Sequence, residues 1–218
     1  MKLLVLGSTG PTGRQFIDLA LRAGDTVTAF ARNPSALGDL VDRVTLVTGD
    51  ATSHHDVTAA AAGQDAIVST LGRGTSLRAD ELFTRSSSAV IDAAKATGVS
   101  RLMWLSSFGV GETFAWSSVT QKLIYGTLLR EIYADKRISE ERIRSSGLDW
   151  TVVYPTRLTH GPGMGTFQAA DHLPMMGNPT ISRADVAAFM HQALHSGEWI
   201  HRSPVITNWN LSFTIFPR

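Results

Sequence analysis

The sequence predicts a doubly wound α/β fold, in which helices cover both faces of a parallel sheet as a three-layer α/β/α sandwich. Three observations indicate this class. Short apolar runs alternate with amphipathic stretches along the 218 residues. The runs are continuous, as in strands buried on both faces. Glycines follow three of the amphipathic stretches, at the position where helices commonly end. We expect one domain, 1–218, with a small substrate-covering segment at about 157–218.

Each element follows from its local pattern. Leu3–Leu6 is an apolar run that ends in glycine, which predicts a buried strand. Thr12–Ala23 has helical spacing and is closed by Gly24. Later helices are closed by Gly98 and Gly147, and the last begins at the N-cap Ser182 with Asp185 in its first turn. The other predicted strands are Val27–Ala31, Val44–Val47, Ala66–Leu71, Arg101–Leu105 and Thr151–Tyr154, and the other predicted helices are Asp56–Ala62, Ala79–Thr97, Val119–Ser146 and Ser182–His195.

Composition excludes several classes of function. The net charge of +1 gives no global field for nucleic acid or an anionic membrane. The absence of cysteine excludes disulfides, thiolate zinc sites and a cysteine nucleophile. The apolar run at the N-terminus is shorter than the roughly 7–15 residues of a secretory signal, so we expect a cytoplasmic protein. Its expected partner is a small-molecule substrate, with no nucleic acid or membrane, and both a monomer and a homodimer remain open.

A glycine-rich turn follows the first strand and opens the first helix. In an α/β sheet, ligands bind at the carboxyl ends of the strands where strand order reverses. The turn has the spacing G-x-x-G-x-x-G, in which the first glycine permits the sharp turn, the second a close approach to a pyrophosphate, and the third close helix packing. We therefore expect a dinucleotide diphosphate to bind at Gly7, Thr9, Gly10, Pro11, Thr12 and Gly13.

The end of the second strand predicts NADP(H) rather than NAD(H). An acidic residue there would bind the ribose hydroxyls of NAD, whereas arginine accommodates the 2′-phosphate of NADP. This chain has Arg32 and Asn33 at that place, and a guanidinium matches the geometry of a phosphate.

Together these motifs resemble the atypical short-chain dehydrogenase/reductases, in particular the NAD(P)H-binding, NmrA-like and biliverdin/flavin-reductase-like branch. The resemblance covers most of the chain and implies a Rossmann-type fold. Its further marks are Gly49-Asp50-Ala51, Gln64-Asp65-Ala66, Ser69-Thr70-Leu71-Gly72, Trp104-Leu105-Ser106-Ser107 and Ser146-Gly147-Leu148-Asp149-Trp150-Thr151-Val152-Val153-Tyr154-Pro155. It implies that Asp50 and Ala51 border the adenine and that Leu71 and Gly72 pass beside the ribose. It also places Tyr154, Pro155 and Thr156 on the nicotinamide side.

The main branch of that superfamily uses a serine, a tyrosine and a lysine. By position, Ser107 is the substrate-facing hydroxyl and Ser106 lies nearer the cofactor. Lys136 is expected to hold the nicotinamide ribose. Tyr133 is the candidate general acid, although it precedes Lys136 by three residues instead of the usual four. Hydride transfer to a flavin or a tetrapyrrole needs no tyrosine, because water can supply the proton.

The first hypothesis for function is therefore an NADPH-dependent reductase of a carbonyl, quinone, flavin or similar conjugated acceptor. A second is a redox sensor that binds NADP without turnover, as NmrA-like proteins do, and the Tyr133–Lys136 spacing keeps it open. Epimerase chemistry is a third, less favoured because the chain is short for a second substrate domain.

Two further patterns have modest interpretations. His191 and His195 lie one helical turn apart, but no third ligand is placed by the sequence, so we expect solvated histidines and no metal site. The glycine-rich stretch from His160 to Gly177, with Met164, Met175 and Met176, is either a mobile lid over substrate or an ordinary surface loop.

Overall fold

The computed structural model describes residues 1–74, 76, 80–173 and 177–208. Within them, an eight-stranded sheet has the order β3-β2-β1-β4-β5-β6-β10-β8, and β7 pairs with β9 in a small second sheet. The strands are β1 (Lys2–Leu6), β2 (Thr26–Ala31), β3 (Thr45–Thr48), β4 (Ala66–Ser69), β5 (Arg101–Leu105), β6 (Asp149–Pro155), β7 (Arg157–Thr159), β8 (Gln168–Ala170), β9 (Thr180–Ser182) and β10 (Val205–Thr207). The large sheet is parallel except for β8. The predicted doubly wound fold is confirmed.

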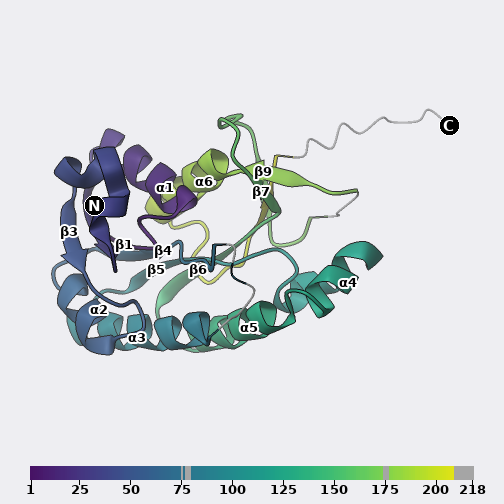
Figure 1. Ribbon diagram of the computed structural model, residues 1–218, viewed down its shortest axis with the longest axis horizontal. Coiled ribbons are helices and arrows are strands. Elements are labelled where there is room, and N and C mark those ends of the chain that lie inside the picture. Colours follow the sequence, from purple (N-terminus) through teal and green to yellow (C-terminus); the bar gives the residue numbers. More distant parts are fainter. Residues whose placement is uncertain (75, 77–79, 174–176, 209–218) are drawn as a thin grey trace.

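The helices form two layers, one on each face of the sheet (Figure 1). The helices are α1 (Pro11–Arg22), α2 (His54–Ala61), α3 (Leu82–Thr97), α4 (Val119–Gly126), α5 (Arg130–Arg144) and α6 (Arg183–Ser196), with 3₁₀ segments at Pro34–Arg43 and Gly111–Phe114. In Figure 1, α1 and α6 cover one face, and α2, α3 and α5 cover the other. In the part of the chain described, every helix is too short or too polar to cross a membrane.

Strand β1 shows why its sequence is a continuous apolar run. Leu3 and Val5 belong to the core beneath α1 and α6, whereas Leu4 and Leu6 belong to the core beneath α2, α3 and α5. All four side chains are fully buried. Because successive residues of a strand point to opposite faces, a strand covered on both sides must be apolar at every position.

The predicted strands and most predicted helices end within three residues of their expected limits. Ala79, the predicted start of α3, lies outside the described residues. The prediction of one helix over Val119–Ser146 is wrong, because α4 ends at Gly126 and α5 begins at Arg130. Glycine is a poor helix former, and Leu129, the N-cap of α5, lies outside the helical region with φ −106° and ψ 8°.

The four short strands β7–β10 and the 3₁₀ segment Pro34–Arg43 carried no sequence prediction. Each of these strands has three residues, which is too few to display a period of two. Their pairing depends on contacts between residues that lie far apart in the chain, such as Val205 with Tyr154.

Candidate functional site

A cavity of about 810 Å³ lies at the carboxyl ends of the central strands. Strand order reverses between β1 and β4, and the loops after both strands line the cavity. The lining contains most of the residues that the sequence singles out: Gly7, Thr9, Gly10, Pro11, Thr12, Arg32, Asp50, Ala51, Leu71, Gly72, Ser106, Ser107, Tyr133 and Lys136. The fold thus brings the predicted cofactor segments and the predicted catalytic segments to one cavity.

The glycine turn is shaped by contacts that leave no room for side chains. Gly7 has a φ of +76°, in the left-handed region that favours glycine. A Cβ on Gly13 would lie 2.3 Å from the Gly7 carbonyl oxygen and 2.8 Å from Oγ1 of Thr70. That Oγ1 donates to the carbonyl oxygens of Leu6 and Gly7, at 3.1 Å each. Gly13 is therefore a packing glycine, outside the cavity lining, that lets α1 start close against the end of β4.

Helix α1 starts in a state suited to an anion. Its N-cap is Gly10, no side chain caps it, and its first turn holds no acidic residue. Pro11 occupies the first helical position, where a missing N–H costs nothing. Free backbone amides and the positive end of the helix dipole consequently face the cavity, and these are the groups that hold a diphosphate. The residues present fit the dinucleotide that the turn predicts.

Two predicted residues at the end of β2 have different positions. Arg32 lines the cavity with an exposed side chain, so its guanidinium is accessible to a phosphate. Asn33 is outside the lining, and its Oδ1 accepts a hydrogen bond of 2.7 Å from Ser35. Of the pair, Arg32 alone faces the cavity.

At the other side of the cavity, Lys136 donates a hydrogen bond of 2.7 Å from Nζ to Oγ of Ser107. Lys136 is buried, and its Nζ lies 4.8 Å from the centroid of the Phe83 ring. Burial lowers the pKa of Lys136 from 10.5 to about 8, despite the opposing charges of Glu140 and Asp135. The pair is a buried ammonium, easier to deprotonate than an exposed one, in contact with a half-buried hydroxyl that lines the cavity.

Asp135 fixes α5 against α3, a role that no pattern in the sequence predicts. Its carboxylate accepts hydrogen bonds of 2.9 Å from the backbone amides of Phe83 and Thr84. Helix α3 has no side-chain cap of its own and starts from Glu81 in a left-handed conformation. Asp135 therefore caps α3 from the neighbouring helix and holds the adjacent Lys136 at the cavity.

Tyr133 lines the cavity, but its hydroxyl is already engaged. It donates to the carbonyl oxygen of Phe108 at 3.2 Å, and its ring stacks on Tyr125 with centroids 4.8 Å apart. Burial raises the pKa of Tyr133, and Tyr125 adds to the rise. The break between α4 and α5 makes this stacking possible, since it returns Tyr125 toward Gly109.

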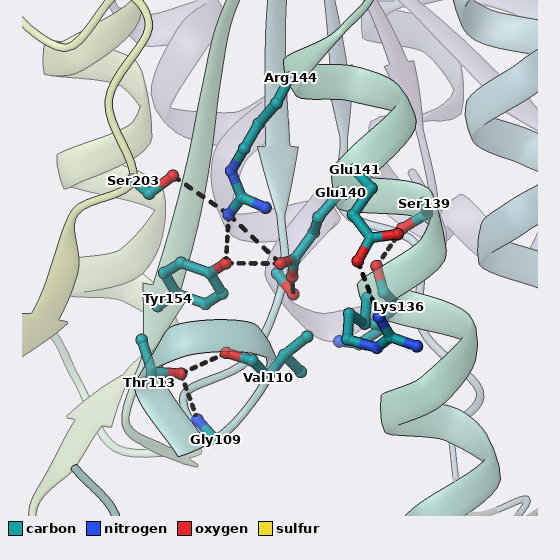
Figure 2. Close-up of polar contacts among 12 residues, drawn as sticks. Gly109, Val110, Thr113, Lys136, Ser139, Glu140, Glu141, Arg144, Tyr154 and Ser203 are labelled. Carbon is teal, nitrogen blue, oxygen red and sulfur yellow. Dashed lines mark hydrogen bonds and ion pairs between the residues drawn. The ribbon is translucent and has the colours of Figure 1, made fainter. Parts of the chain in front are cut away.

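Ser106 has a different partner from Ser107. Its hydroxyl donates to Oε1 of Glu140. Oε2 of the same carboxylate accepts from the hydroxyl of Tyr154 (Figure 2). Arg144 approaches both Tyr154, at 2.6 Å, and Glu140, at 3.4 Å. Burial raises the pKa of Glu140, against the hydrogen bonds of Ser106 and Tyr154 and the charge of Arg144. The side chain of Glu140 is completely buried.

The residues expected on the nicotinamide side lie outside the lining of the large cavity. Tyr154 is committed to Glu140 and Arg144 and borders a second cavity of about 250 Å³. Pro155 ends β6, and Thr156 is buried with Oγ1 3.2 Å from that of Thr207. In the stretch expected as a lid or loop, the amides of Met164 and Gly165 donate to Asp185 of α6, while Met175 and Met176 lie outside the described residues.

Several other residues that line the cavity belong to no motif that the sequence reveals. Phe30, Phe83, Leu129, Ile132 and Leu158 supply apolar surface, and Arg73 and Arg183 supply positive charge. They come from six separate parts of the chain, so only the three-dimensional fold brings them together.

The chain is similar to several known proteins over most of its length. The chain is 27% identical over 223 residues to the UPF0659 protein YMR090W of Saccharomyces cerevisiae, covering 96% of this chain and 94% of that protein. It is 27% identical to the uncharacterized sugar epimerase YhfK of Bacillus subtilis, covering 86% and 85%. Its fold is similar to that of ChuY, an anaerobilin reductase of Escherichia coli O157:H7, with a TM-score of 0.80, 26% identity and coverage of 94% and 96%.

The family profile described as NAD(P)H-binding matches residues 7–197, from the first glycine of the turn to the glycine that ends α6. That span includes the whole of the cavity lining described above. The chain therefore belongs to the NAD(P)H-binding family, with an oxidoreductase-like Rossmann fold.

Proposed function

We propose that this protein is an NADPH-dependent reductase that transfers hydride to a small conjugated acceptor. One observation carries the proposal: a single cavity joins the uncapped start of α1 to the Ser107–Lys136 pair. The first group suits a dinucleotide, and the second suits proton delivery to an acceptor. Hydride and proton must reach the same molecule, so their sources have to share a cavity.

The cofactor would be held by residues whose geometry already fits it. The free amides at the start of α1 would bind the diphosphate, and Arg32 would bind the 2′-phosphate that distinguishes NADPH from NADH. Asp50 and Ala51 would border the adenine, with Leu71 and Gly72 beside the ribose. When bound, NADPH supplies the hydride.

Lys136 and Ser107 would supply the proton. An ammonium has three N–H donors, so Lys136 can donate to Ser107 and still hold a ribose hydroxyl. The Ser107 hydroxyl would give its proton to the reduced acceptor, and Lys136 would replace that proton. A lysine pKa near 8 makes this transfer easier than the ordinary value of 10.5 would.

The walls of the cavity support a flat, anionic acceptor. Apolar side chains on α5 and around it offer surface for a conjugated ring system, and Arg183 offers positive charge, whereas Arg73 is paired with Asp80. The similarity to ChuY supports a tetrapyrrole within this class. Flavins and quinones have the same flat conjugated chemistry.

A second candidate is a sensor that binds NADP without turnover. It is favoured by the position of Tyr133, whose hydroxyl donates to a backbone carbonyl instead of standing free for a substrate. In the reductase, the proton must then come from another group, whereas the sensor needs no proton donor.

The test follows the loss of NADPH absorbance at its nicotinamide band with tetrapyrrole, flavin, quinone and aldehyde acceptors. NADH serves as the cofactor control, and Tyr133→Phe is compared with the wild type. We expect turnover with NADPH, and turnover kept within about threefold in the variant, because Lys136 and Ser107 remain in place.

Each of the other outcomes would support a different function or a different role for a residue. Turnover lost in Tyr133→Phe would make Tyr133 the general acid of a carbonyl-type reductase. Tight NADPH binding with no turnover on any acceptor would support the sensor. Equal use of NADH would remove the role of Arg32. Interconversion of a sugar nucleotide without net cofactor consumption would support an epimerase, the activity named for YhfK.

A further inference from the structure

A second cluster of polar side chains lies on α6 and in the turn after α1, away from the cofactor cavity. His191 and His195 stand one turn apart on α6, and their Nε2 atoms lie 2.8 Å and 3.0 Å from Oδ2 of Asp25. Asp25 lies between α1 and β2, 166 positions before His191. The sequence places no third partner beside these histidines, which were expected to be solvated, and the fold provides that partner.

The three ligand atoms converge on one point from two elements. All of them lie within 4.8 Å of one another. In a tetrahedral zinc site with bonds of about 2.0–2.1 Å, neighbouring ligand atoms are separated by roughly 3.4 Å. The two histidine nitrogens lie 2.8 Å and 3.0 Å from Oδ2 of Asp25. Each of these distances would have to increase by only a few tenths of an ångström to accommodate the ion.

The three side chains of the cluster differ in their exposure to solvent, with Asp25 the most buried and His195 the most exposed. The exposed fraction of the side chain is 3% for Asp25, 17% for His191 and 37% for His195. Oδ1 of Asp25 accepts a hydrogen bond of 2.6 Å from the amino group of Met1. The other carboxylate oxygen, Oδ2, contacts both histidines. His191 is positioned further by Phe16, with ring centroids 6.2 Å apart. An ion would thus have a fixed ligand inside and an open side toward solvent.

Two imidazoles that both face one carboxylate oxygen need explaining. As a purely hydrogen-bonded cluster, both histidines would donate from Nε2 to the same oxygen. As a metal site, both neutral imidazoles present a lone pair and the carboxylate balances the charge of the ion, which is the ligand chemistry of zinc. Nitrogen ligands without sulfur select against soft monovalent ions, and the paired imidazoles select against Ca²⁺ and Mg²⁺.

We propose that Asp25, His191 and His195 form a binding site for a divalent transition metal of the zinc class, with water as the fourth ligand. The site would connect α6 to the turn that follows α1. Both helices begin at the cofactor cavity, α1 at Pro11 and α6 at Arg183, and both end near the cluster. Helix α1 is 12 residues long, which puts about 18 Å between its ends. The metal would therefore stabilise the fold without touching the reacting atoms.

The test uses the full chain without a histidine tag and measures binding of Co²⁺ by its visible absorption, followed by displacement with Zn²⁺. We expect one ion per chain with the intense bands of a four-coordinate Co²⁺ site. We also expect Zn²⁺ to raise the melting temperature, because an ion that binds only the folded state stabilises it.

The deciding variant is His195→Gln, with His191→Gln as a second. A glutamine amide can still donate a hydrogen bond to Asp25 but is a poor zinc ligand, so the fold is kept and the site is lost. We expect affinity to fall by at least about 100-fold, more than loss of an outer-shell partner costs. The matched control is His54→Gln with His55→Gln, an exposed pair on α2, which should bind as the wild type does.

Three results would overturn the proposal: no stoichiometric Co²⁺ binding by the wild type, unchanged binding in both glutamine variants, or binding lost in the His54/His55 control. The first would leave the cluster as a hydrogen-bonded contact. None of these measurements depends on turnover, so the result is independent of the reductase proposal.

Discussion

Ser106 and Ser107 are consecutive residues after β5, yet α5 gives them partners of opposite charge. Ser107 accepts a hydrogen bond from the ammonium of Lys136, and Ser106 donates one to the carboxylate of Glu140. Lys136 and Glu140 lie four residues apart, one turn of the same helix. Two neighbouring hydroxyls and one helix thus build two polar centres.

The two centres differ in how many of the hydrogen-bonding groups of the charged side chain have a partner. Glu140 contacts Tyr154 and Arg144 (Figure 2). It also accepts a hydrogen bond from Ser106, and its side chain is fully buried. Lys136 donates one side-chain hydrogen bond within the described residues, and that bond goes to a serine that lines the cavity. A saturated network stabilises a fold, whereas a charged group with donors to spare beside a cavity can act on a ligand. We infer that the Glu140 centre is structural and the Lys136 centre is functional.

The largest expected effect comes from removing the ammonium with Lys136→Met, which keeps a long apolar side chain in a buried position. We expect turnover to fall by about 10²- to 10⁴-fold, the usual contribution of a positioned proton donor. Steady-state NADPH consumption measures it, with circular dichroism to confirm the fold. Arg137→Met, next along the helix but exposed, is the matched control. Turnover within about twofold of wild type in Lys136→Met would remove the lysine from the mechanism.

The second effect is on stability. Glu140→Ala leaves the Tyr154 hydroxyl and the Arg144 guanidinium without their buried acceptor, so we expect the free energy of unfolding to fall by about 3–5 kcal/mol. Glu140→Gln, which keeps an acceptor, should cost less. Urea denaturation measures both, and the exposed neighbour Glu141→Ala should change stability by no more than about 1 kcal/mol. A Glu140→Gln protein of normal stability but without turnover would contradict the division into a structural and a functional centre.

This division marks the limit of what the sequence could predict. The glycine turn, Arg32 and the serines after β5 were found because local spacing places them at strand ends, and most of that set lines the cavity. Tyr154 was expected at the cofactor by family position, but its hydroxyl turns to Glu140 and Arg144 on α5. The pairing of Asp25 with two histidines of α6 was equally invisible, since no local period connects positions 166 residues apart. Local chemistry could be predicted, and long-range pairing of polar side chains could not.

The finest test of the comparison is pH, because only the Lys136 centre should titrate in the mildly alkaline range. Burial holds the pKa of Lys136 at about 8, below its ordinary 10.5. Turnover that needs the ammonium should be full below pH 8 and should then fall by about tenfold per pH unit. Stability should change in the opposite direction. Between pH 8 and 10 the unfolded chain binds more protons at this lysine than the folded chain does, so this group's contribution to stability rises with pH.

The two trends are measured as a rate profile and as urea midpoints from pH 7 to 9, below the pKa of 10 at which tyrosines of the unfolded chain lose their protons and the raised pKa values of Tyr133 and Tyr154 begin to affect stability. Lys136→Met should remove both trends together, because one proton causes both. If the rate falls while the stability difference between wild type and Lys136→Met stays constant with pH, a group other than Lys136 titrates in the reaction. In that case Ser107 would receive its proton from solvent, and the lysine would serve only to hold the cofactor.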